Sequence, residues 1–272
     1  MPSRFPTFYL THGGGPWPYM TGPMREMHSK LEASLKDLPR QLGARPEAIL
    51  VISGHWEDAD FAVMANPAPP MLYDFGGFPR EMYQIQYASR GAPELAKRAE
   101  ALIQKSGLHS HLDGNRGFDH GTYSILSVSY PRADVPVLQV SIRSDYSPEA
   151  HLKLGRALAP LRDQGVLIIA SGSSYHDLRG FFSQDGVNPK RDSAEFDAWL
   201  QETLVHLTGD RRSNRLLNWE QAPAARAAHP QEDHLIPLHV AVGAAEAERG
   251  HVIYSQNDFF GRLTLSSYRF GG

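Results

Sequence analysis

The chain has 272 residues, of which 41% are hydrophobic, and it can therefore bury a sizeable core. Its 27 Lys and Arg are balanced by 30 Asp and Glu, so the charge pattern does not indicate a nucleic-acid-binding surface. Because the chain has no cysteine, disulfides, thiolate nucleophiles and iron–sulfur clusters are excluded, and any bound metal must use imidazole, carboxylate or carbonyl ligands.

That set of ligands favours Fe(II), Zn(II) or Mn(II) as the metal. No apolar run reaches the roughly 18 residues that a membrane helix requires. The first residues also lack the apolar stretch of a signal peptide. We therefore expect a soluble, cytoplasmic protein with neither a nucleic-acid nor a membrane partner.

In chain order, an apolar run rich in β-branched and aromatic residues predicts a strand at 5–10, and a helical period follows at 23–38. Strands are next predicted at 48–53 and 61–65, helices at 93–105 and 122–129, and a strand at 135–142. A helix at 148–163, a strand at 166–170, helices at 193–207 and 232–248, and a strand at 251–255 complete the pattern. Several of these helices begin just after a proline or a plausible capping residue.

Strands that alternate with helices predict an α/β fold, in which helices cover both faces of a mostly parallel sheet. We find no repeat, low-complexity tract or long linker, so residues 1–272 are expected to form a single three-layer αβα domain. The stretch 66–90 is rich in proline, glycine and aromatic residues and interrupts the alternation. We expect it to form a lid or a wall of the substrate site.

Three histidines follow predicted strands. His12 begins the segment His-Gly-Gly-Gly-Pro after the strand at 5–10, His55 follows the strand at 48–53, and His176 follows the strand at 166–170. In open α/β sheets, ligands bind beyond the carboxyl ends of the strands, so these side chains are expected at one edge of the sheet. One histidine in such a place is usually structural, whereas three together indicate a metal or catalytic centre.

A fourth histidine, His120, stands between Asp119 and Gly121 at the entrance to an apolar segment. This position suits a side chain that points into a cleft. The alternative is that the segment only caps a helix, with Asp119 or Thr122 as the capping residue.

The segment 228–239 contains three further histidines. Pro230 fits the first turn of a helix, which would place His234 near the helix N-terminus. His229 and His234 are five residues apart and do not share a helix face, so we expect them to have different roles. His239 lies among apolar residues and is expected to be structural, as are the histidines at positions 28, 109, 111, 151, 206 and 251.

Five segments carry a family resemblance. They are Thr-His-Gly-Gly-Gly-Pro at 11–16, Ser-Gly-His-Trp-Glu at 53–57, Gly-Phe-Asp-His-Gly at 117–121, Ser-Gly-Ser-Ser-Tyr-His-Asp at 171–177 and His-Pro-Gln-Glu-Asp-His at 229–234. Together they resemble the class III extradiol dioxygenases, and more closely the 4,5-DOPA dioxygenase branch, single-chain relatives of the catalytic subunit of protocatechuate 4,5-dioxygenase. The segments span nearly the whole chain in the family's order, and five together are specific although each alone is not.

The resemblance implies an αβα fold with a non-haem Fe(II) held by His12, His55 and a third ligand in the last segment. Many class III enzymes use a glutamate there, whereas this chain has His234, as is expected in the 4,5-DOPA branch. Three neutral ligands would leave the metal its full double charge and strengthen its attraction for a catecholate. The carboxylates at positions 57, 232 and 233 remain alternative ligands, and zinc remains an alternative metal.

The implied reaction cleaves a catechol ring, so the expected partners are a small aromatic diol and O2. Such a reaction needs a base that takes protons from the catechol and an acid that returns a proton to oxygen. The resemblance assigns these roles to His176 and His120. His176 is expected to be the base or an occasional fourth metal ligand, and His120 to assist oxygen activation and proton delivery.

By the same resemblance, Asp119 and Asp177 are expected to orient the two catalytic rings, and Tyr175 and His229 to contact the substrate. A carboxylated catechol would in addition need a cationic partner. Four arginines lie near the motifs: Arg80, Arg116, Arg143 and Arg179.

Two other functions remain open. Three histidines with an open position also describe catalytic zinc, and the protein would then be a hydrolase with Glu57 or Asp177 as its general base. The third hypothesis is a non-enzymatic binding protein of the same fold. The presence of His120 and His176 beside the ligand set argues against it.

Overall fold

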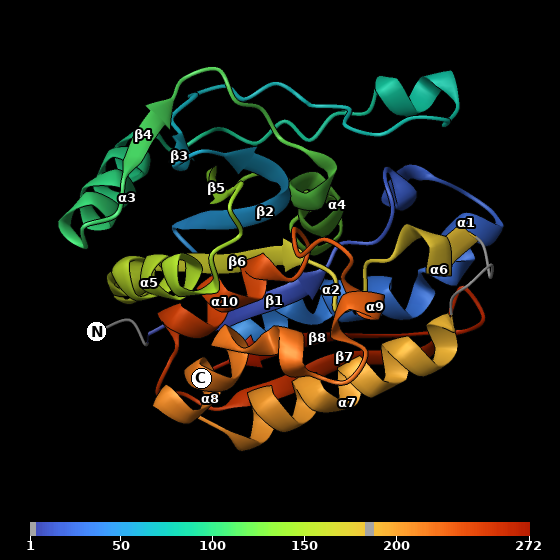
Figure 1. Cartoon of the computed structure of the whole chain (residues 1–272). Coiled ribbons are helices and arrows are strands. Elements are labelled where there is room, and N and C mark those ends of the chain that lie inside the picture. Colours follow the sequence, from blue (N-terminus) through green and yellow to red (C-terminus); the bar gives the residue numbers. More distant parts are fainter. Residues whose placement is uncertain (1–3, 183–187) are drawn as a thin grey trace.

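The computed structural model describes residues 4–182 and 188–272, and its central feature is one sheet of eight strands (Figure 1). The strand order across the sheet is β4-β3-β5-β2-β6-β1-β8-β7. The strands are β1 (Thr7–Thr11), β2 (Ala48–Asp58), β3 (Phe61–Met64), β4 (Ser110–Asp113), β5 (Val137–Arg143), β6 (Val166–Gly172), β7 (Gly250–Phe259) and β8 (Leu263–Phe270).

The four strands at the centre of the sheet run parallel. β5 pairs with β2, β2 with β6, and β6 with β1. β1 and β6 are buried along their whole length, which explains why their sequences are nearly continuous apolar runs. On the two flanks, β3 pairs antiparallel with β5, and β8 pairs antiparallel with β1 and β7. The expectation of an α/β fold with a mostly parallel sheet is confirmed.

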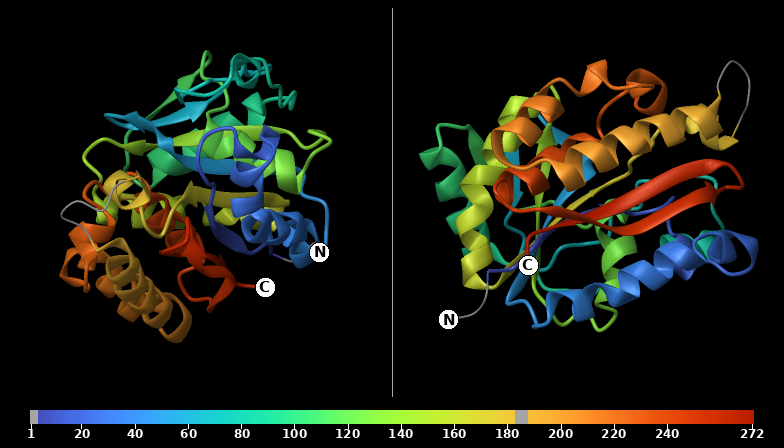
Figure 2. Two further views of the ribbon diagram at one scale, coloured as in Figure 1. Left: turned by 90° about the vertical axis from the view of Figure 1, so that its right-hand side faces the viewer. Right: turned by 90° about the horizontal axis from the view of Figure 1, so that it is seen from below.

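Helices cover both faces of this sheet. On one face, α10 packs on β1, β2 and β6, α5 packs on α10, and α7 packs on β7 and β8. On the other face, α2 contacts β7 and α4, and α4 packs on β2 and β6. Figure 2 shows α2 and α7 on opposite sides of the β7–β8 pair. No helix in the described part of the chain has both the length and the apolar character that crossing a membrane requires.

The α-helices have the following bounds: α1 (Pro23–Met27), α2 (Ser29–Leu42), α3 (Pro93–Lys105), α4 (His120–Ser129), α5 (Pro148–Leu158), α6 (Leu178–Phe182), α7 (Pro189–His206), α8 (Gly209–Leu217), α9 (Ala225–Ala228) and α10 (Ile236–Ala244). Four short 3-10 helices complete the set: η1 (Trp17–Tyr19), η2 (Arg80–Tyr83), η3 (Ala159–Gln164) and η4 (Trp219–Gln221). The helix predicted at 93–105 is observed with the same ends.

The helices predicted at 122–129, 148–163 and 193–207 correspond to α4, α5 and α7, with ends shifted by up to five residues. Two other predicted helices differ more from the observed ones. The helical period at 23–38 is interrupted at His28, whose φ of −91° and ψ of 4° separate α1 from α2. The helix predicted at 232–248 begins only at Ile236, because Pro237 rather than Pro230 occupies its first turn. His234 therefore lies in a turn before α10 and not inside the helix.

The strands differ from the prediction in two respects. β2 continues to Asp58, so His55 lies inside the strand, where the pairing with β5 shifts register between Ile52 and Glu57. Such bulges occur next to active sites because they redirect a side chain. The prediction also lacks β4 and β8. β4 is a short, polar, partly exposed edge strand, and two serines interrupt the apolar pattern of β8.

Candidate metal centre

His12 follows β1 directly, where the chain turns away from the sheet. Its amide donates a hydrogen bond to the carbonyl of Gly172, 3.3 Å away at the end of β6. Gly13 has a φ of 75°, and a Cβ atom on it would lie 2.5 Å from the indole Nε1 of Trp17. That indole donates to the His12 carbonyl at 2.6 Å. A glycine at position 13 therefore permits the turn that holds His12 at the carboxyl end of the strand.

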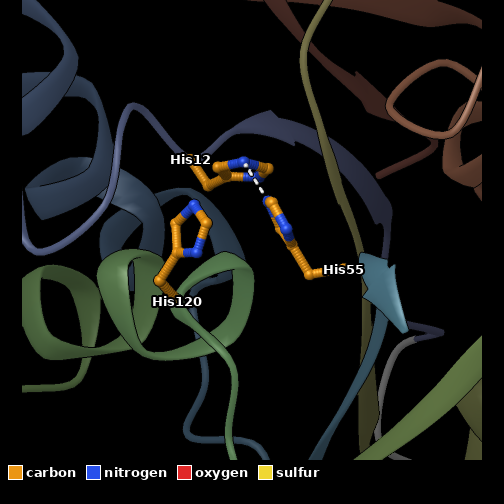
Figure 3. A group of neighbouring side chains, drawn as sticks. All are labelled: His12, His55 and His120. Atoms are coloured by element: carbon orange, nitrogen blue, oxygen red, sulfur yellow. Dashed lines mark hydrogen bonds between the residues drawn. The ribbon is translucent and has the colours of Figure 1, made fainter. Parts of the chain in front are cut away.

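His55 projects from the bulge of β2 toward His12. The Nε2 atoms of the two rings are 3.2 Å apart. Figure 3 shows both rings, together with the ring of His120 from α4, turned toward one shared space. His12 is buried, whereas the side chain of His55 is 20% exposed and can be reached from the solvent.

His234 reaches the same space from the turn before α10. Its carbonyl accepts hydrogen bonds from the hydroxyl of Tyr9 at 2.8 Å and from the amide of Ser173 at 3.1 Å. A Cβ atom on Gly172 would collide with this carbonyl, so glycine lets β6 and the turn approach each other. Held in this way, His234 has its Nε2 atom 3.1 Å from that of His55.

Hydrogen bonds to the second ring nitrogen determine which nitrogen of each imidazole is unprotonated. His12 Nδ1 lies 3.0 Å from the hydroxyl of Ser171, which donates its own proton to the Gly121 carbonyl at 2.6 Å. The hydroxyl must therefore accept from His12 Nδ1. His234 Nδ1 lies 2.8 Å from the carboxylate of Asp233, which can only accept. In both neutral rings, Nδ1 carries the proton and Nε2 carries the lone pair.

The Nδ1 atom of His55 lies 3.4 Å from the carboxylate of Asp74, which favours the same tautomer. The Nε2 lone pairs of His12 and His234 therefore both face the lone pair of His55, at 3.2 and 3.1 Å. Lone pairs at this separation repel one another unless a proton or a cation lies between them. Two nitrogen ligands of a tetrahedral metal, each about 2.0–2.1 Å from it, lie about 3.3–3.4 Å apart. The donor set thus fits a divalent metal.

Low proton affinity keeps these rings available as ligands. Burial lowers the pKa of His12 and of His234 well below the usual histidine value, and the neighbouring imidazoles lower it further. Burial, with the nearby ring of His120, lowers the pKa of His55 to about 4. Since a histidine must be neutral to ligate a metal, protons compete poorly for this site at neutral pH.

His120 is the first residue of α4 and approaches the group from a different element. Its Nδ1 and its amide lie 2.9 and 3.0 Å from the two carboxylate oxygens of Asp74. Ligand atoms of His12, His55 and His120 lie within 4.8 Å of one another, so these three residues also form a group able to hold a metal. The structure thus brings two alternative third ligands, His120 and His234, to the same pair.

His176 follows β6 and stacks on His234. The two ring centroids are 3.4 Å apart and the ring planes differ by 16°. His176 Nδ1 lies 3.7 Å from Oδ1 of Asp233, whose Oδ2 accepts from His234. Because the rings stack and both Nδ1 atoms approach one carboxylate, the two Nε2 atoms point to the same side.

All five histidines line a cavity of about 510 Å³. Most of the remaining lining is apolar and includes six phenylalanines: Phe75, Phe78, Phe181, Phe182, Phe259 and Phe260. Two of these, Phe75 and Phe78, belong to the irregular segment 66–90, which therefore forms one wall of the cavity. A larger hollow of about 690 Å³ between residues 39–45 and 129–135 contains none of the five histidines.

The sequence matches the family described as the catalytic LigB subunit of aromatic ring-opening dioxygenase over residues 6–270. The chain belongs to this family. A 4,5-DOPA dioxygenase extradiol of Beta vulgaris is 40% identical over 268 residues, which cover 97% of this chain and 96% of that protein. A protein of the same name from Escherichia coli K12 is 32% identical over 271 residues, which cover 99% and 96%. The crystal structure of an uncharacterised protein from Escherichia coli K12 is 29% identical, with a TM-score of 0.78, and the match covers 98% of this chain and 100% of that one.

As a member of the LigB family, the protein is an enzyme, an extradiol dioxygenase, and hence an oxidoreductase. The resemblance found in the five sequence segments is confirmed. The family is metal-dependent, and the buried histidine group supplies the ligands that a metal requires.

The fold of this dioxygenase brings five of the expected site residues together at the cavity: His12, His55, His120, His176 and His234. Tyr175 and His229, the expected substrate contacts, are 1% and 0% exposed and do not line the cavity. His229 Nε2 instead lies 3.1 Å from the carbonyl of Ser174, and the ring packs against Phe196. The ring of Tyr175 packs against Phe181, a residue of the cavity lining, with 5.9 Å between the ring centroids.

The expected orienting carboxylates also have other partners. Asp119 caps α4 and accepts a hydrogen bond from Arg116 at 2.7 Å, and Asp177 pairs with Arg179 at 3.1 Å. Neither forms a hydrogen bond with His120 or His176 in the described structure. Two further carboxylates from the sequence analysis lie outside the histidine group and bind neighbouring side chains: Glu57 binds Tyr146, and Glu232 binds Arg226.

Asp74 is the site residue that sequence reasoning missed. It lies in the segment 66–90, where no periodic pattern predicts which side chains face inward. Its partner His120 is 46 residues away, so no local spacing relates them. The available signal was a single acid between two aromatic residues, Tyr73 and Phe75, in a stretch expected to border the substrate.

Proposed function

We propose that this protein is an Fe(II)-dependent extradiol dioxygenase that cleaves a substituted catechol, the class to which DOPA belongs. The observation that carries the proposal is the convergence of the Nε2 lone pairs of His12, His55 and His234 at an apolar cavity of about 510 Å³. DOPA appears in the names of several relatives, and a planar aromatic diol suits a cavity walled by phenylalanines.

His12, His55 and His234 are the proposed metal ligands. We prefer His234 to His120 as the third ligand because its Nε2 lies 3.1 Å from that of His55, close to the distance between two ligands of one metal, and because the sequence resemblance places a ligand in the segment 229–234. Fe(II), when bound there, supplies a redox-active Lewis acid at which a catecholate can react with dioxygen. Ser171, Asp233 and Asp74 hold the three rings in the required tautomer.

His176 and His120 are left for proton transfer. His176 lines the cavity beside His234, and we assign to it the removal of a proton from a catechol hydroxyl. His120 has its Nδ1 bound to Asp74, so its Nε2 is the nitrogen that can pass a proton to oxygen. His176 approaches the cavity from the loop after β6, and His120 approaches it from the start of α4. Two bases at different places can remove a proton from one atom and deliver a proton to another.

Oxygen uptake tests the proposal. Protein reconstituted with Fe(II) without air should consume dioxygen on addition of a substituted catechol and form a yellow ring-opened product, with one O2 used per catechol. The absence of oxygen uptake across a panel of substituted catechols would contradict it.

Metal exchange separates iron from zinc. The same preparation loaded with Zn(II) should bind catechol without consuming oxygen, because zinc has no accessible redox change. Turnover with zinc alone would exclude the iron-dependent mechanism. Hydrolysis of ester or amide substrates by the zinc form would instead support the hydrolase alternative.

A further inference from the structure

The cavity of the proposed dioxygenase is lined by almost no ionisable side chains other than its histidines. None of the described residues that line it is lysine or arginine, and its one carboxylate is Asp233. Residues 183–187, which lie outside the described structure, contain no lysine or arginine either. Oδ2 of Asp233 accepts from His234, and Oδ1 is buried 3.7 Å from Nδ1 of His176, without a hydrogen-bond partner among the described residues.

Of the four arginines near the motifs, Arg80 is exposed and does not line the cavity, and Arg143 pairs with Asp145. The other two are also committed to neighbouring groups. Arg116 donates to Asp119 and to the His55 carbonyl and lies over the ring of Trp56, 4.8 Å from its centroid. Arg179 pairs with Asp177 at 3.1 Å.

Arg262, at the turn between β7 and β8, is also committed to other groups. It donates to the carbonyls of Gly180 and Phe181 at 3.0 and 2.9 Å. None of the guanidinium groups of Arg116, Arg179 and Arg262 is directed at the cavity as a partner for a substrate carboxylate.

The mouth of the cavity presents exposed apolar side chains. Phe182 and Leu178 are 77% and 57% exposed, the two largest values among the large hydrophobic residues of the described chain, and both line this cavity. Phe181 and Phe260 lie beside them, with ring centroids 5.6 Å apart. Apolar surface that stays exposed at a cavity mouth is typical of a site that an apolar ligand covers.

We propose that the substrates are uncharged catechols with an apolar alkyl or aryl substituent, and that the substituent lies against Leu178, Phe181, Phe182 and Phe260. This inference rests on the proposed function. A carboxylate held against these apolar side chains would lose part of its hydration and would gain no cation in return. Each methylene group of an alkyl substituent would instead strengthen binding about fourfold.

A matched series of three catechols tests the proposal: 4-propylcatechol, dopamine and 3-(3,4-dihydroxyphenyl)propionate. They have side chains of similar length that are neutral, cationic and anionic. Calorimetric titration of the Fe(II)-loaded enzyme without oxygen should show that 4-propylcatechol binds about tenfold or more tightly than the anionic compound. Equal or tighter binding of the anion, or of dopamine, would overturn the proposal.

Binding and ring cleavage are read separately, so the two proposals can fail independently. If the neutral catechol binds best but no oxygen is consumed, the proposed function is wrong, and only the preference of the cavity for binding uncharged catechols stands. If all three catechols are cleaved with equal affinity, the specificity inference is wrong and the proposed function stands.

A variant at the mouth tests the location of the substituent. Leu178→Arg adds a cation at a position that is 57% exposed, and Leu178→Gln is the uncharged control. Leu178→Arg should strengthen binding of the anionic catechol about fivefold to tenfold relative to 4-propylcatechol, because it supplies the missing partner. Leu178→Gln should not strengthen binding of the anionic catechol relative to 4-propylcatechol. An unchanged ratio in Leu178→Arg would overturn the placement of the substituent.

Discussion

The carboxylate of Asp74 accepts two hydrogen bonds from His120, one from Nδ1 at 2.9 Å and one from the backbone amide at 3.0 Å. Burial alone would raise the pKa of Asp74, but its hydrogen bonds and charge interaction with His120 dominate and lower it to about 2. Asp74 is therefore ionised at every pH at which the enzyme is expected to work. It fixes the position and the tautomer of a histidine to which we assign proton delivery.

Replacement of Asp74 with asparagine should lower kcat about 10- to 100-fold, because the amide neither stabilises a protonated His120 nor selects one tautomer. The metal content should fall by a smaller factor than kcat, because Asp74 is not a proposed ligand. Some loss is expected, since Asp74 lies 3.4 Å from the ligand His55. The pH profile of kcat should shift, which a merely structural change would not cause. Asp60→Asn removes the same charge from an exposed residue and is the control. A kcat equal to that of the unmodified enzyme would refute the role of Asp74.

Single alanine variants distinguish the two possible ligand sets. Metal analysis should find that His12→Ala, His55→Ala and His234→Ala lose bound metal, because each removes one of three ligands. His120→Ala should keep its metal and lose turnover.

The exposed residue His109 supplies the control, and His109→Ala should change neither property. If His120→Ala loses metal as completely as His55→Ala does, while His234→Ala retains it, the third ligand is His120.

Because β6 closely approaches the turn that carries His234, adding one methyl group to Gly172 should affect both stability and metal binding. In Gly172→Ala the new Cβ would collide with the His234 carbonyl, so the turn must move. We expect a loss of about 1–3 kcal/mol of stability and metal binding weakened about 10- to 100-fold, measured by chemical unfolding and by metal titration. Gly114→Ala is the matched control, because nothing lies within 4 Å of a Cβ atom at that position. Equal metal affinity in the two variants would show that the turn is not held by this contact.

Buried histidines outside the site predict how stability depends on pH. His151 is fully buried, its Nδ1 donates to the Ser147 carbonyl at 2.7 Å, and its Nε2 accepts from the Arg143 amide at 3.1 Å. Burial lowers its pKa to about 3. The unfolded chain, in which histidine has a pKa of about 6.5, therefore binds the proton first as the pH falls. The free energy of unfolding should fall between pH 6.5 and 3 by up to about 1.4 kcal/mol per pH unit for this group, and should not depend on it above pH 6.5.

Urea unfolding of metal-free protein at pH 7, 6 and 5 measures this slope. His151→Gln removes the titrating group, so the variant should be less stable at pH 7 but should lose stability more slowly as the pH falls. His109→Gln, at an exposed position, should retain the slope of the unmodified protein. An identical slope in His151→Gln would exclude His151 as a source of the pH dependence.

The sequence by itself determined the central parallel strands and the histidines at their ends. A strand buried on both faces must be apolar at nearly every residue, so β1 and β6 are visible as continuous runs, and His12 and His176 stand where those runs stop. The five motifs also identified the family, because their order along the chain is a property of the sequence alone.

Only the tertiary structure decided how the rings are held and what surrounds them. The bulge that aims His55 depends on the pairing of β2 with β5, and the turn of His234 depends on Tyr9, 225 residues away. Asp74 meets His120 through a segment without periodicity. The apolar mouth forms where residues near 178 and 260 come together. Such contacts join residues that are distant in the chain, and a local pattern of residues carries no information about them until the chain is folded.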